Sequence, residues 1–427
     1  MSRGLDRQAD WLTAGEALER ILAAVQPLPP ENVPLAEALG RALAETVVSP
    51  IDQPPWDNSG MDGFACRAED VAGACPEGPL RLIVIENVPA GAFPSQAVGP
   101  RQAVRLMTGA PLPAGADSVV RLEHTYALSG ASIAVVQDQD AGRNVRQKGE
   151  DLRRGQVVLE AGRVLRPAEI GILASVGRTQ PQVHRRARVA ILSNGDELVD
   201  VDQFEQVLAG RRIVSSNSHS LAAAVRAAGG RPKVLGIARD TRESLREHLA
   251  RIGGADILVT TAGASVGDHD LMKDVLEELG YALDFWRVKI QPGSPFSFGR
   301  LGDVLVFGLP GNPVSALVTF EALVRPAIRK LHGRRDVYPP AVTVTAAERI
   351  ESRPGLMRLL RATLESDGAG GWRARLTGPQ GSGILSSVAG ADALLILPID
   401  TAVVEPGTVL RALPLRPSDD GALVAPF

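Results

Sequence analysis

The sequence predicts a multidomain protein that joins a parallel α/β domain to smaller β domains. Its 427 residues exceed the length at which one hydrophobic core usually serves a whole chain. Within 188–331, apolar strand-like runs alternate with helical segments of about 10–14 residues, which is typical of βαβ units. On both sides of this stretch, short apolar runs are broken by Gly and Pro, as in β domains with frequent turns.

The first 50 residues predict two helices. Thr13 and Glu16 have the spacing of a capping box, and apolar residues follow at helical intervals from Ala17 to Val25. A proline-rich break at 27–34 ends this helix. A second short helix is predicted from Leu35 to Ala44.

A small β domain is predicted from Ser49 to about Gln139. Its candidate strands are LRLIVIENV (80–88), AVRLMTG (103–109), SVVRLEHTYAL (118–128) and ASIAVVQ (131–137). The following segment, 141–162, is polar and rich in loop-forming residues. A short helix is then predicted from Pro167 to Val176, with Pro in its first turn.

The α/β domain is predicted from four buried strands and the helices between them. The strands are RVAILS (188–193), VLGIA (234–238), DILVTT (256–261) and DVLVFGL (303–309). The helices begin near Asn217, Thr241 and Leu271, and a last one runs from Pro313 to Leu331 with a kink at Pro326. The last hundred residues return to β-like runs, which predict a C-terminal β domain.

Composition excludes several classes of function. Aromatic residues make up only 4% and the net charge is −3, which argues against a base-stacking nucleic-acid platform or a general polyanion binder. No run approaches about 18 apolar residues, so no membrane span is predicted. Cys66 and Cys75 fit neither a disulfide framework nor a zinc site, and the N-terminus shows no apolar leader segment; a cytoplasmic protein is therefore expected.

The chemistry is expected at the carboxyl ends of the parallel strands, where open α/β sheets bind ligands. Carboxylates beside glycine-rich loops suit a hydrated Mg²⁺ and a phosphorylated ligand. Since carboxylates alone would repel a phosphate, nearby cations must offset them. The carboxylates are Glu197, Asp240, Asp268 and Asp270, and the candidate cations are Lys273, Arg287 and Lys289.

Each part of this rim also has a simpler explanation. An Asp after a strand is often a turn or helix-capping residue, and Asp240 stands directly before a predicted helix. Ala262–Gly267 can be a tight turn alone, and Lys289 can be a solvated strand edge. His269 is the one histidine within a candidate site.

GLPGNPVSA (308–316) is the more specific loop. Asn312 can cap the following helix, Pro313 suits its first position and Gly311 lets a ligand approach the backbone. The exposed amides would then form an anion site, while a rigid strand-to-helix turn is the alternative.

A second polar cluster lies upstream. PPWDNSGMDGFACRAED (54–70) brings Asp57, Asn58, Ser59 and Asp62 together, and MTGAPLPAGADSVVRLE (107–123) exposes Thr108 between strands. Ordinary hairpin turns are the alternative explanation. Neither stretch contains a nucleophile with a paired base, and no GxSxG, P-loop or GxGxxG fingerprint stands at a strand-to-helix junction.

The ordered motifs resemble the molybdopterin molybdenumtransferase family of molybdenum cofactor biosynthesis, which includes MoeA proteins and the E domain of gephyrin. The motifs that carry the resemblance are NSGMDGFA (58–65), MTGAPLPAGADSVV (107–120), GRNVRQKGEDLRRG (142–155), SNGDEL (193–198), TTAGASVGDHD (260–270), PGSPFSFG (292–299) and GLPGNPVSA (308–316).

The resemblance implies four domains and a homodimer. A discontinuous helical domain would comprise 1–50 and 141–182, an inserted β domain 51–140, a molybdopterin-binding α/β domain 183–331 and a C-terminal β domain 332–427. The active cleft would lie between the α/β domain of one chain and the inserted β domain of the other. Molybdopterin adenylyltransferase and downstream molybdoenzyme maturation factors are the implied partners.

The implied reaction inserts molybdate into adenylyl-molybdopterin with release of AMP, and Mg²⁺ is the implied cofactor. Attack of a molybdate oxygen or of water on the adenylyl phosphorus is the mechanistic hypothesis. Glu197, Asp240 and Asp270 would hold the metal. The catalytic set implied is Asp62, Thr108, Glu197, Asp240, Asp270 and Lys273, and the substrate-binding set is Gly263, Ser265, Gly267, Arg287, Lys289, Gly311, Asn312, Ser315, Arg361, Ser382 and Ser386.

The chain departs from the family pattern at several positions. Gln291 and Ser294 stand where the family usually has lysines, Arg287 replaces a further lysine, and Leu356 follows Gly355 where the family has Arg. These changes bear on anion affinity and on the choice between molybdate and tungstate, not on the fold. Two alternative functions stay open: a related enzyme, such as a molybdopterin adenylyltransferase or a nucleotide amidohydrolase, and a non-catalytic molybdopterin-binding scaffold.

Overall fold

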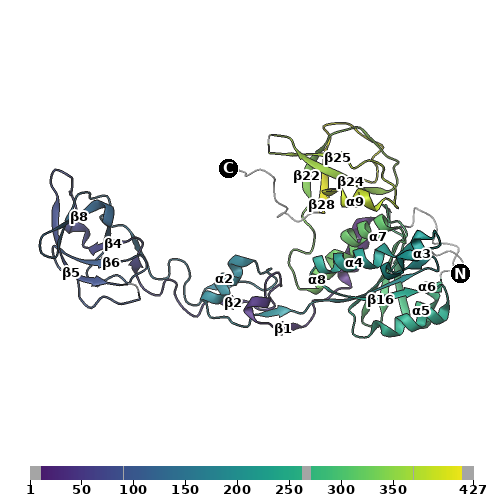
Figure 1. The fold of residues 1–427 in the computed structure, drawn as a ribbon, viewed down its shortest axis with the longest axis horizontal. Helices are drawn as coiled ribbons and strands as arrows, with labels where there is room; N and C mark the ends of the chain where they lie inside the picture. The colour runs from purple at the N-terminus through teal and green to yellow at the C-terminus, as the bar shows by residue number, and fades with distance from the viewer. Residues whose placement is uncertain (1–10, 90, 262–270, 369, 416–427) are drawn as a thin grey trace. The chain divides into compact units, whose positions relative to one another are not determined.

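A computed structural model describes residues 11–89, 91–261, 271–368 and 370–415 (Figure 1). The chain divides into two compact units. The first unit comprises Met1–Ala44, Gly162–Arg166 and Gln180–Phe427, and the second comprises Glu45–Ala161 and Pro167–Thr179.

The second unit contains the predicted β domain. Its six strands form one sheet in the order β7-β4-β6-β5-β9-β8. Both faces of this sheet are covered by hydrophobic cores. Successive residues of a strand point to opposite faces, so Phe64 and Cys66 pack into the core on one face and Ala65 into the core on the other. The strands are β4 (Gly63–Cys66), β5 (Leu80–Val88), β6 (Gln102–Leu106), β7 (Ser118–Arg121), β8 (Thr125–Leu128) and β9 (Ser132–Val135).

Short elements complete the second unit. Two small antiparallel pairs flank the sheet in the sequence, and a nine-residue helix follows them. These elements are β2 (Val47–Val48) with β11 (Val157–Leu159), β3 (Asn58–Ser59) with β10 (Val145–Arg146), and helix α2 (Pro167–Ser175).

The first unit contains the predicted α/β sheet, with strands in the order β16-β13-β17-β21-β20-β18. The four predicted strands run parallel. Two further strands, β18 and β20, continue the sheet antiparallel and were not predicted. The strands are β13 (Arg188–Asn194), β16 (Arg231–Ala238), β17 (Ile257–Thr261), β18 (Tyr281–Trp286), β20 (Ser297–Leu301) and β21 (Val304–Leu309).

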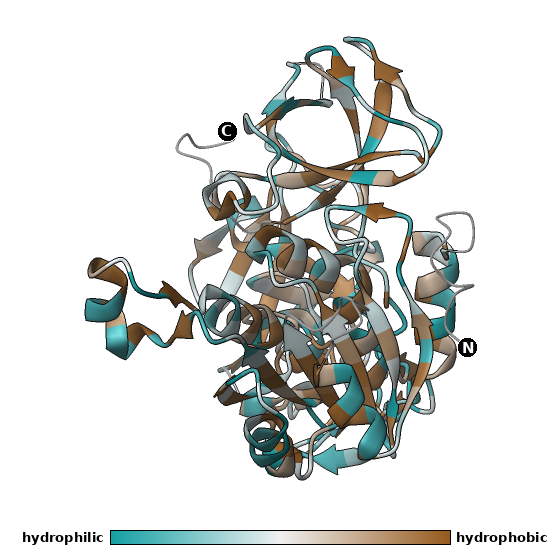
Figure 2. Cartoon of the chain, turned by 90° about the vertical axis from the view of Figure 1, so that its right-hand side faces the viewer, coloured by the Kyte–Doolittle hydropathy of each residue, from teal (hydrophilic) through white to brown (hydrophobic). Residues whose placement is uncertain are grey.

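Helices cover both faces of this sheet. Val189 and Ile191 enter the core shared with α1, α4, α7 and α8, whereas Ala190 and Leu192 enter the core shared with α5 and α6. Figure 2 shows hydrophobic residues concentrated on the strands. The helices are α1 (Ala14–Ala23), α4 (Ser216–Ala227), α5 (Arg242–Leu249), α6 (Leu271–Glu278), α7 (Pro313–Thr319) and α8 (Arg325–Leu331); the short α3 (Phe204–Leu208) lies outside both cores.

The predicted capping box is confirmed, since Thr13 accepts from the Glu16 amide and Glu16 accepts from the Thr13 amide. The helix predicted over Leu35–Ala44 is wrong. Only Leu35–Glu37 forms a 3₁₀ turn, because the chain beyond it pairs in extended form, with bridges from Ala42 to Val164 and from Leu43 to Val183.

The last helix also differs from its prediction. A π-helical turn, Phe320–Val324, separates α7 from α8 where a kink at Pro326 was predicted. Pro326 then lies in the first turn of α8, where its missing N–H costs no helical hydrogen bond.

The C-terminal residues form a closed ring of five strands. The ring closes because β24 pairs with both β25 and β26. Strand β19 (Ile290–Gln291), from the α/β segment, adds to β24 in parallel. The ring strands are β22 (Val342–Ala346), β24 (Met357–Ser366), β25 (Trp372–Leu376), β26 (Ala393–Leu397) and β28 (Val409–Pro414), and helix α9 (Leu385–Ala389) precedes β26. Across the described residues, no helix has the length and apolar character needed to cross a membrane.

Close packing of the sheet makes a testable contrast between two glycines. A Cβ on Gly299 would lie 2.3 Å from the Ala282 carbonyl oxygen and 2.6 Å from the Tyr281 ring, whereas a Cβ on Gly171, in the exposed middle of α2, would contact nothing. We expect Gly299→Ala to lower the free energy of unfolding by about 2 kcal/mol. Gly171→Ala should raise it by up to about 1 kcal/mol. Urea unfolding measures both, and an unchanged midpoint for Gly299→Ala would contradict this packing.

Candidate active site

Two carboxylates meet where β13 and β16 end. Asn194 and Ala238 are register partners, so the turns that follow them start side by side. Asn194 Nδ2 donates to Asp240 Oδ1 at 3.1 Å, and the Asp196 and Asp240 amides each lie 3.4 Å from a carboxylate oxygen of the other. Thr241, not Asp240, caps α5. The carboxylate of Asp240 therefore belongs to the rim of the sheet, as the strand-end argument predicts.

Glu197 lies in the same turn as Asp196. Gly195 has φ +149°, and a Cβ there would lie 2.7 Å from Glu197 Oε1. The Glu197 carboxylate therefore folds back over a residue that only glycine accommodates. The structure thus brings Glu197 and Asp240 to one rim. Six further predicted residues lie outside the described part of the chain: Gly263, Ser265, Gly267, Asp268, His269 and Asp270.

A buried layer of hydroxyl groups supports this rim. Ser193 Oγ, at the end of β13, lies 2.9 Å from Thr261 Oγ1 at the end of β17 and 3.0 Å from Ser218 Oγ in α4. Ser215 joins the same network. This layer was not predicted, although hydroxyl residues at the ends of two neighbouring strands and at the start of a helix are a usable signal in the sequence.

The GLPGNPVSA loop is held from two sides. Asn217 Nδ2, in α4, donates to the Gly311 carbonyl at 2.7 Å. Asn312 stands at the N-cap of α7 but makes no side-chain cap; its Nδ2 donates to Ser382 Oγ at 3.0 Å instead. The Ser382 carbonyl accepts from the Val314 amide. The capping prediction for Asn312 is therefore wrong, and one amide of the expected anion site is already occupied.

Arg361 is a fully buried charge of the first unit. Its side chain is fully buried in β24; Nε donates to Ser387 Oγ at 3.1 Å and Nη2 to the Gly381 carbonyl at 3.0 Å. Nη1 is buried without a partner, and no carboxylate pairs with Arg361 in the part of the chain that the structure describes. Burial lowers the pKa of Arg361 from its ordinary value. A buried guanidinium without a counter-charge is costly unless an anion pairs with it.

Hydroxyl groups lie near Arg361. Ser386 lines a pocket of about 340 Å³ together with Ser387, Thr363 and Thr377. Ser382 belongs to the loop that follows Gly381 and contacts α7. Ser315 is buried in α7, where its carbonyl accepts from Thr319 Oγ1 at 2.7 Å. The ring of strands and the α/β domain therefore meet through the loop that also binds Arg361.

Residues 287–294, here called the basic segment because they include Arg287 and Lys289, mainly make contacts that stabilise the fold. The Arg287 guanidinium lies over the rings of Trp11 and Trp286, 4.8 and 4.1 Å from their centroids. The Lys289 amide donates to the Leu12 carbonyl, and the Lys289 carbonyl accepts from the Met357 amide. Ser294 Oγ donates to the Ile290 carbonyl at 2.6 Å. The structure thus assigns Arg287 to a cation–π stack, which the sequence analysis did not predict.

Lys273 lies apart from this segment, in the first turn of α6. It is 3.6 Å from Glu277 and lines a small cavity of about 20 Å³ with Thr260, Tyr281 and Ser297. A cavity of this size holds about one water molecule. The position of Lys273 relative to Asp270 lies outside the described residues.

The second unit carries the Asp62–Thr108 pair. Asp62 Oδ1 accepts from the Thr108 amide at 2.6 Å and from Thr108 Oγ1 at 2.7 Å. These two hydrogen bonds lower the pKa of Asp62 below its ordinary value. Both residues are exposed, beside the exposed Met61 and Met107. The two turn-rich motifs are therefore adjacent in space, and Asp62 is a fixed, ionised and accessible carboxylate.

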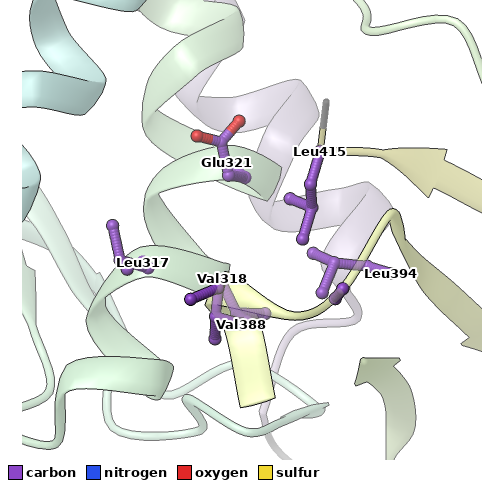
Figure 3. A pocket seen from close by; sticks show the side chains of 8 residues that line it. Leu317, Val318, Glu321, Val388, Leu394 and Leu415 are labelled. Carbon is purple, nitrogen blue, oxygen red and sulfur yellow. The ribbon is translucent and has the colours of Figure 1, made fainter. Parts of the chain in front are cut away.

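A second, mainly apolar pocket lies elsewhere in the first unit. It measures about 270 Å³ and is lined mainly by aliphatic residues of α7, α9 and β26 (Figure 3). Its one charged side chain, Glu321, is paired with Arg325. Apart from this paired carboxylate, the lining side chains are apolar and offer no group for catalysis or anion binding.

Comparison with known proteins covers nearly the whole chain. Residues 12–177 match the MoeA N-terminal region (domain I and II), 190–330 match a probable molybdopterin binding domain, and 343–415 match the MoeA C-terminal region (domain IV). A molybdopterin molybdenumtransferase 2 of Mycobacterium tuberculosis is 37% identical over 90% of this chain and 94% of its own. A molybdopterin molybdenumtransferase of Haemophilus influenzae is 34% identical over 95% and 99%.

A solved structure agrees in fold. The molybdopterin biosynthesis moeA protein of Pyrococcus horikoshii OT3 is similar with a TM-score of 0.82 and 31% identity, over 94% of this chain and all of that one.

The Asp62–Thr108 pair makes a prediction about ionisation. Thr108→Val removes the hydroxyl donor but keeps the amide donor, so the pKa of Asp62 should rise toward its ordinary value of 3.8. Thr108→Ser keeps both donors and should leave the pKa low. Carbon-13 NMR titration of labelled Asp, assigned with Asp62→Asn, measures it. Equal Asp62 pKa values in the two variants would show that the hydroxyl does not contribute.

Proposed function

This chain belongs to the molybdopterin molybdenumtransferase family, and on that premise we propose that it inserts molybdate into adenylyl-molybdopterin and releases AMP. The observation that carries the proposal is the fully buried Arg361 guanidinium with its unpaired Nη1. A tetrahedral oxyanion supplies the negative charge and acceptor oxygens that this group lacks. Ser386, Ser387 and the Asn312–Ser382 contact provide hydroxyl and amide groups nearby.

The carboxylate rim supports the phosphate half of the reaction. Mg²⁺ prefers oxygen ligands and is usually held by one or two carboxylates together with substrate phosphates and water. Glu197 and Asp240 have this chemistry, and Asp196 adjoins them; Asp270 is the third proposed ligand. Among the described residues no group of three or more His, Cys, Asp or Glu side chains is placed to hold a metal ion. Bound there, Mg²⁺ would neutralise phosphate charge.

The other proposed site residues bind or orient the substrates. Arg361 binds and orients the molybdate dianion, while its burial excludes water from one side of that ion. Asn217 and Asn312 fix the loop between the two substrates. Asp62, held ionised by Thr108, presents a carboxylate that orients the attacking water or protonated molybdate oxygen toward the adenylyl phosphorus, from which AMP is released. Gly263, Ser265 and Gly267 are proposed to contact the phosphates.

A homodimer is the assembly that this function requires. Asp62 belongs to the second unit and Glu197 to the first, and the family resemblance implies that the two meet across chains. The exposed Met61 and Met107 beside Asp62 are suited to such an interface. The two free thiols, Cys66 and Cys75, agree with a cytoplasmic enzyme, and molybdopterin adenylyltransferase is the proposed source of its substrate.

The central test is release of AMP from adenylyl-molybdopterin, measured with molybdate or tungstate and with or without Mg²⁺. We expect molybdate- and Mg²⁺-dependent AMP. Arg361→Met should raise the molybdate KM at least about tenfold, since a charged hydrogen bond contributes about 1.5–3 kcal/mol. Its thermal stability should not fall, because no carboxylate is left unpaired. Arg361→Lys keeps the positive charge but loses the planar set of guanidinium donors. Its molybdate KM should lie between those of wild type and Arg361→Met.

Two results would overturn this function. The first is a folded protein that binds the nucleotide by calorimetry but releases no AMP with either oxyanion, which would favour a binding scaffold. The second is AMP transfer from ATP by the protein alone, which would favour an adenylyltransferase.

Mixing variants tests whether two chains share each site. Asp62→Asn and Glu197→Gln homodimers should each be inactive. If the site forms across chains, dissociated and reassociated mixtures should recover about a quarter of wild-type AMP release, because half the dimers are mixed and each contains one intact site. A mixture of Glu197→Gln with Asp240→Asn, both in the first unit, should recover none. Equal recovery in both mixtures, or in neither, would contradict the shared site.

A further inference from the structure

The loop that carries Asp62, residues 60–62, is anchored at each end by a backbone hydrogen bond. On one side, the Gly60 amide donates to the Asn144 carbonyl at 2.7 Å. On the other, the Leu122 amide donates to the Asp62 carbonyl at 3.2 Å. A Cβ on Gly63 would lie 2.1 Å from the Val120 carbonyl oxygen, so the loop is pressed directly against β7. The position of the Asp62 carboxylate therefore depends on where Asn144 and the end of β7 are held.

One buried carboxylate holds both of these points. Asp140 is only 2% exposed. It accepts from the Arg121 amide at 3.0 Å, from Arg121 Nε at 3.1 Å, and from Asn144 Nδ2 at 3.0 Å. Arg121 directly precedes Leu122 and is the register partner of Gly63. Each anchoring hydrogen bond of the Asp62 loop is thus linked to Asp140 through one residue, Asn144 at one end and Arg121 at the other.

His124 is a further partner of this carboxylate. Its side chain is buried, and Nδ1 lies 2.7 Å from Asp140 Oδ2. Nε2 lies 2.7 Å from Gln139 Nε2, an amide nitrogen that donates, so Nε2 accepts and the proton is assigned to Nδ1. His124 therefore donates to Asp140 through Nδ1, and its two ring contacts fix the orientation of the ring. Gln139 is itself placed by Gln137 Oε1 at 2.6 Å.

The charge of Asp140 is secured by its donors. Burial alone would raise its pKa, but the hydrogen bonds from Arg121, Asn144 and His124 outweigh burial and lower the pKa to about 2. The carboxylate is therefore ionised at every pH at which the protein would be assayed. Neither Asp140 nor His124 reaches the surface beside Asp62, so neither can contact substrate.

We propose that Asp140, oriented by His124, is a positioning residue for Asp62. The inference rests on the proposed role of Asp62 in AMP release. Asp140 binds Arg121, at the end of β7, and Asn144, whose backbone carbonyl accepts from the Gly60 amide, and so sets the location of a carboxylate it never touches. Misplacement of a reacting group by about 1 Å can cost about a hundredfold in rate, so the network should act on kcat more than on binding.

The first test is Asp140→Asn, which keeps the shape of the side chain but turns one acceptor oxygen into a donor facing other donors. We expect kcat for AMP release to fall at least about tenfold, with the KM for adenylyl-molybdopterin within about twofold of wild type. Hydrogen exchange of the Thr108 amide tests the position of Asp62 independently of enzyme activity, since this amide donates directly to Asp62 Oδ1. Its protection should fall in Asp140→Asn.

A matched pair tests His124. His124→Asn places an amide nitrogen near the position of Nδ1 and can still donate to Asp140, whereas His124→Leu has similar volume and cannot. We expect near wild-type kcat for His124→Asn and a loss similar to that of Asp140→Asn for His124→Leu. This pair keeps the inference testable if Asp140→Asn fails to fold.

Ser132→Ala is the control for simple destabilisation. Ser132 is also buried with two side-chain hydrogen bonds, but it lies in β9, at the other end of the same sheet. This variant should lower the melting temperature without changing kcat or Thr108 protection.

The possible outcomes separate the two proposals. If wild type releases AMP while Asp140→Asn and His124→Leu match it in kcat and Thr108 protection, the positioning role is overturned. A loss of kcat in Ser132→Ala equal to that in Asp140→Asn would also overturn it, because stability alone would then explain the effect. If wild type releases no AMP, the proposed function fails, but Thr108 exchange still decides whether Asp140 positions Asp62.

Discussion

The parallel register of β13, β17 and β21 is the constraint on which the first unit depends. Val189 to Ser193 pair in step with Ile257 to Thr261, which pair in step with Leu305 to Leu309. Both faces of these strands are buried, so helices must cover both. The same register ends the strands at one level. It therefore collects the hydroxyl layer, the Asp196–Asp240 turns and the GLPGNPVSA loop along one edge.

Two buried charges show the difference between a structural group and a binding group. Asp140 accepts hydrogen bonds from three residues, so its charge is fully used inside the fold. Arg361 donates to one hydroxyl and one carbonyl, and its Nη1 has no partner. A satisfied charge stabilises a particular geometry, whereas an unsatisfied one marks a place where a ligand can supply what is missing.

The departures of the basic segment from the family pattern fit this contrast. Ser294 donates to the Ile290 carbonyl of its own loop, and Arg287 packs over the rings of Trp11 and Trp286. Gly293 packs against Thr319 of α7, where a Cβ would lie 2.2 Å from the threonine methyl group. The segment thus contributes mainly to the junction between the α/β domain and the ring of strands, and Arg361 becomes the principal cation proposed for the oxyanion.

The sequence by itself determined the local elements and the composition of the site. The short apolar runs, the Thr13–Glu16 box and the strand-end carboxylates depend on neighbours in the chain, so they were predicted. The antiparallel strands β18 and β20, the extended pairing that replaces the helix at Leu35–Ala44, and the Ser382 partner of Asn312 were decided by tertiary structure. The reason is that each depends on backbone or side-chain groups far away in the sequence. The same holds for Arg361 and Asp140: any sequence shows a charge, but only the folded chain shows whether that charge has partners.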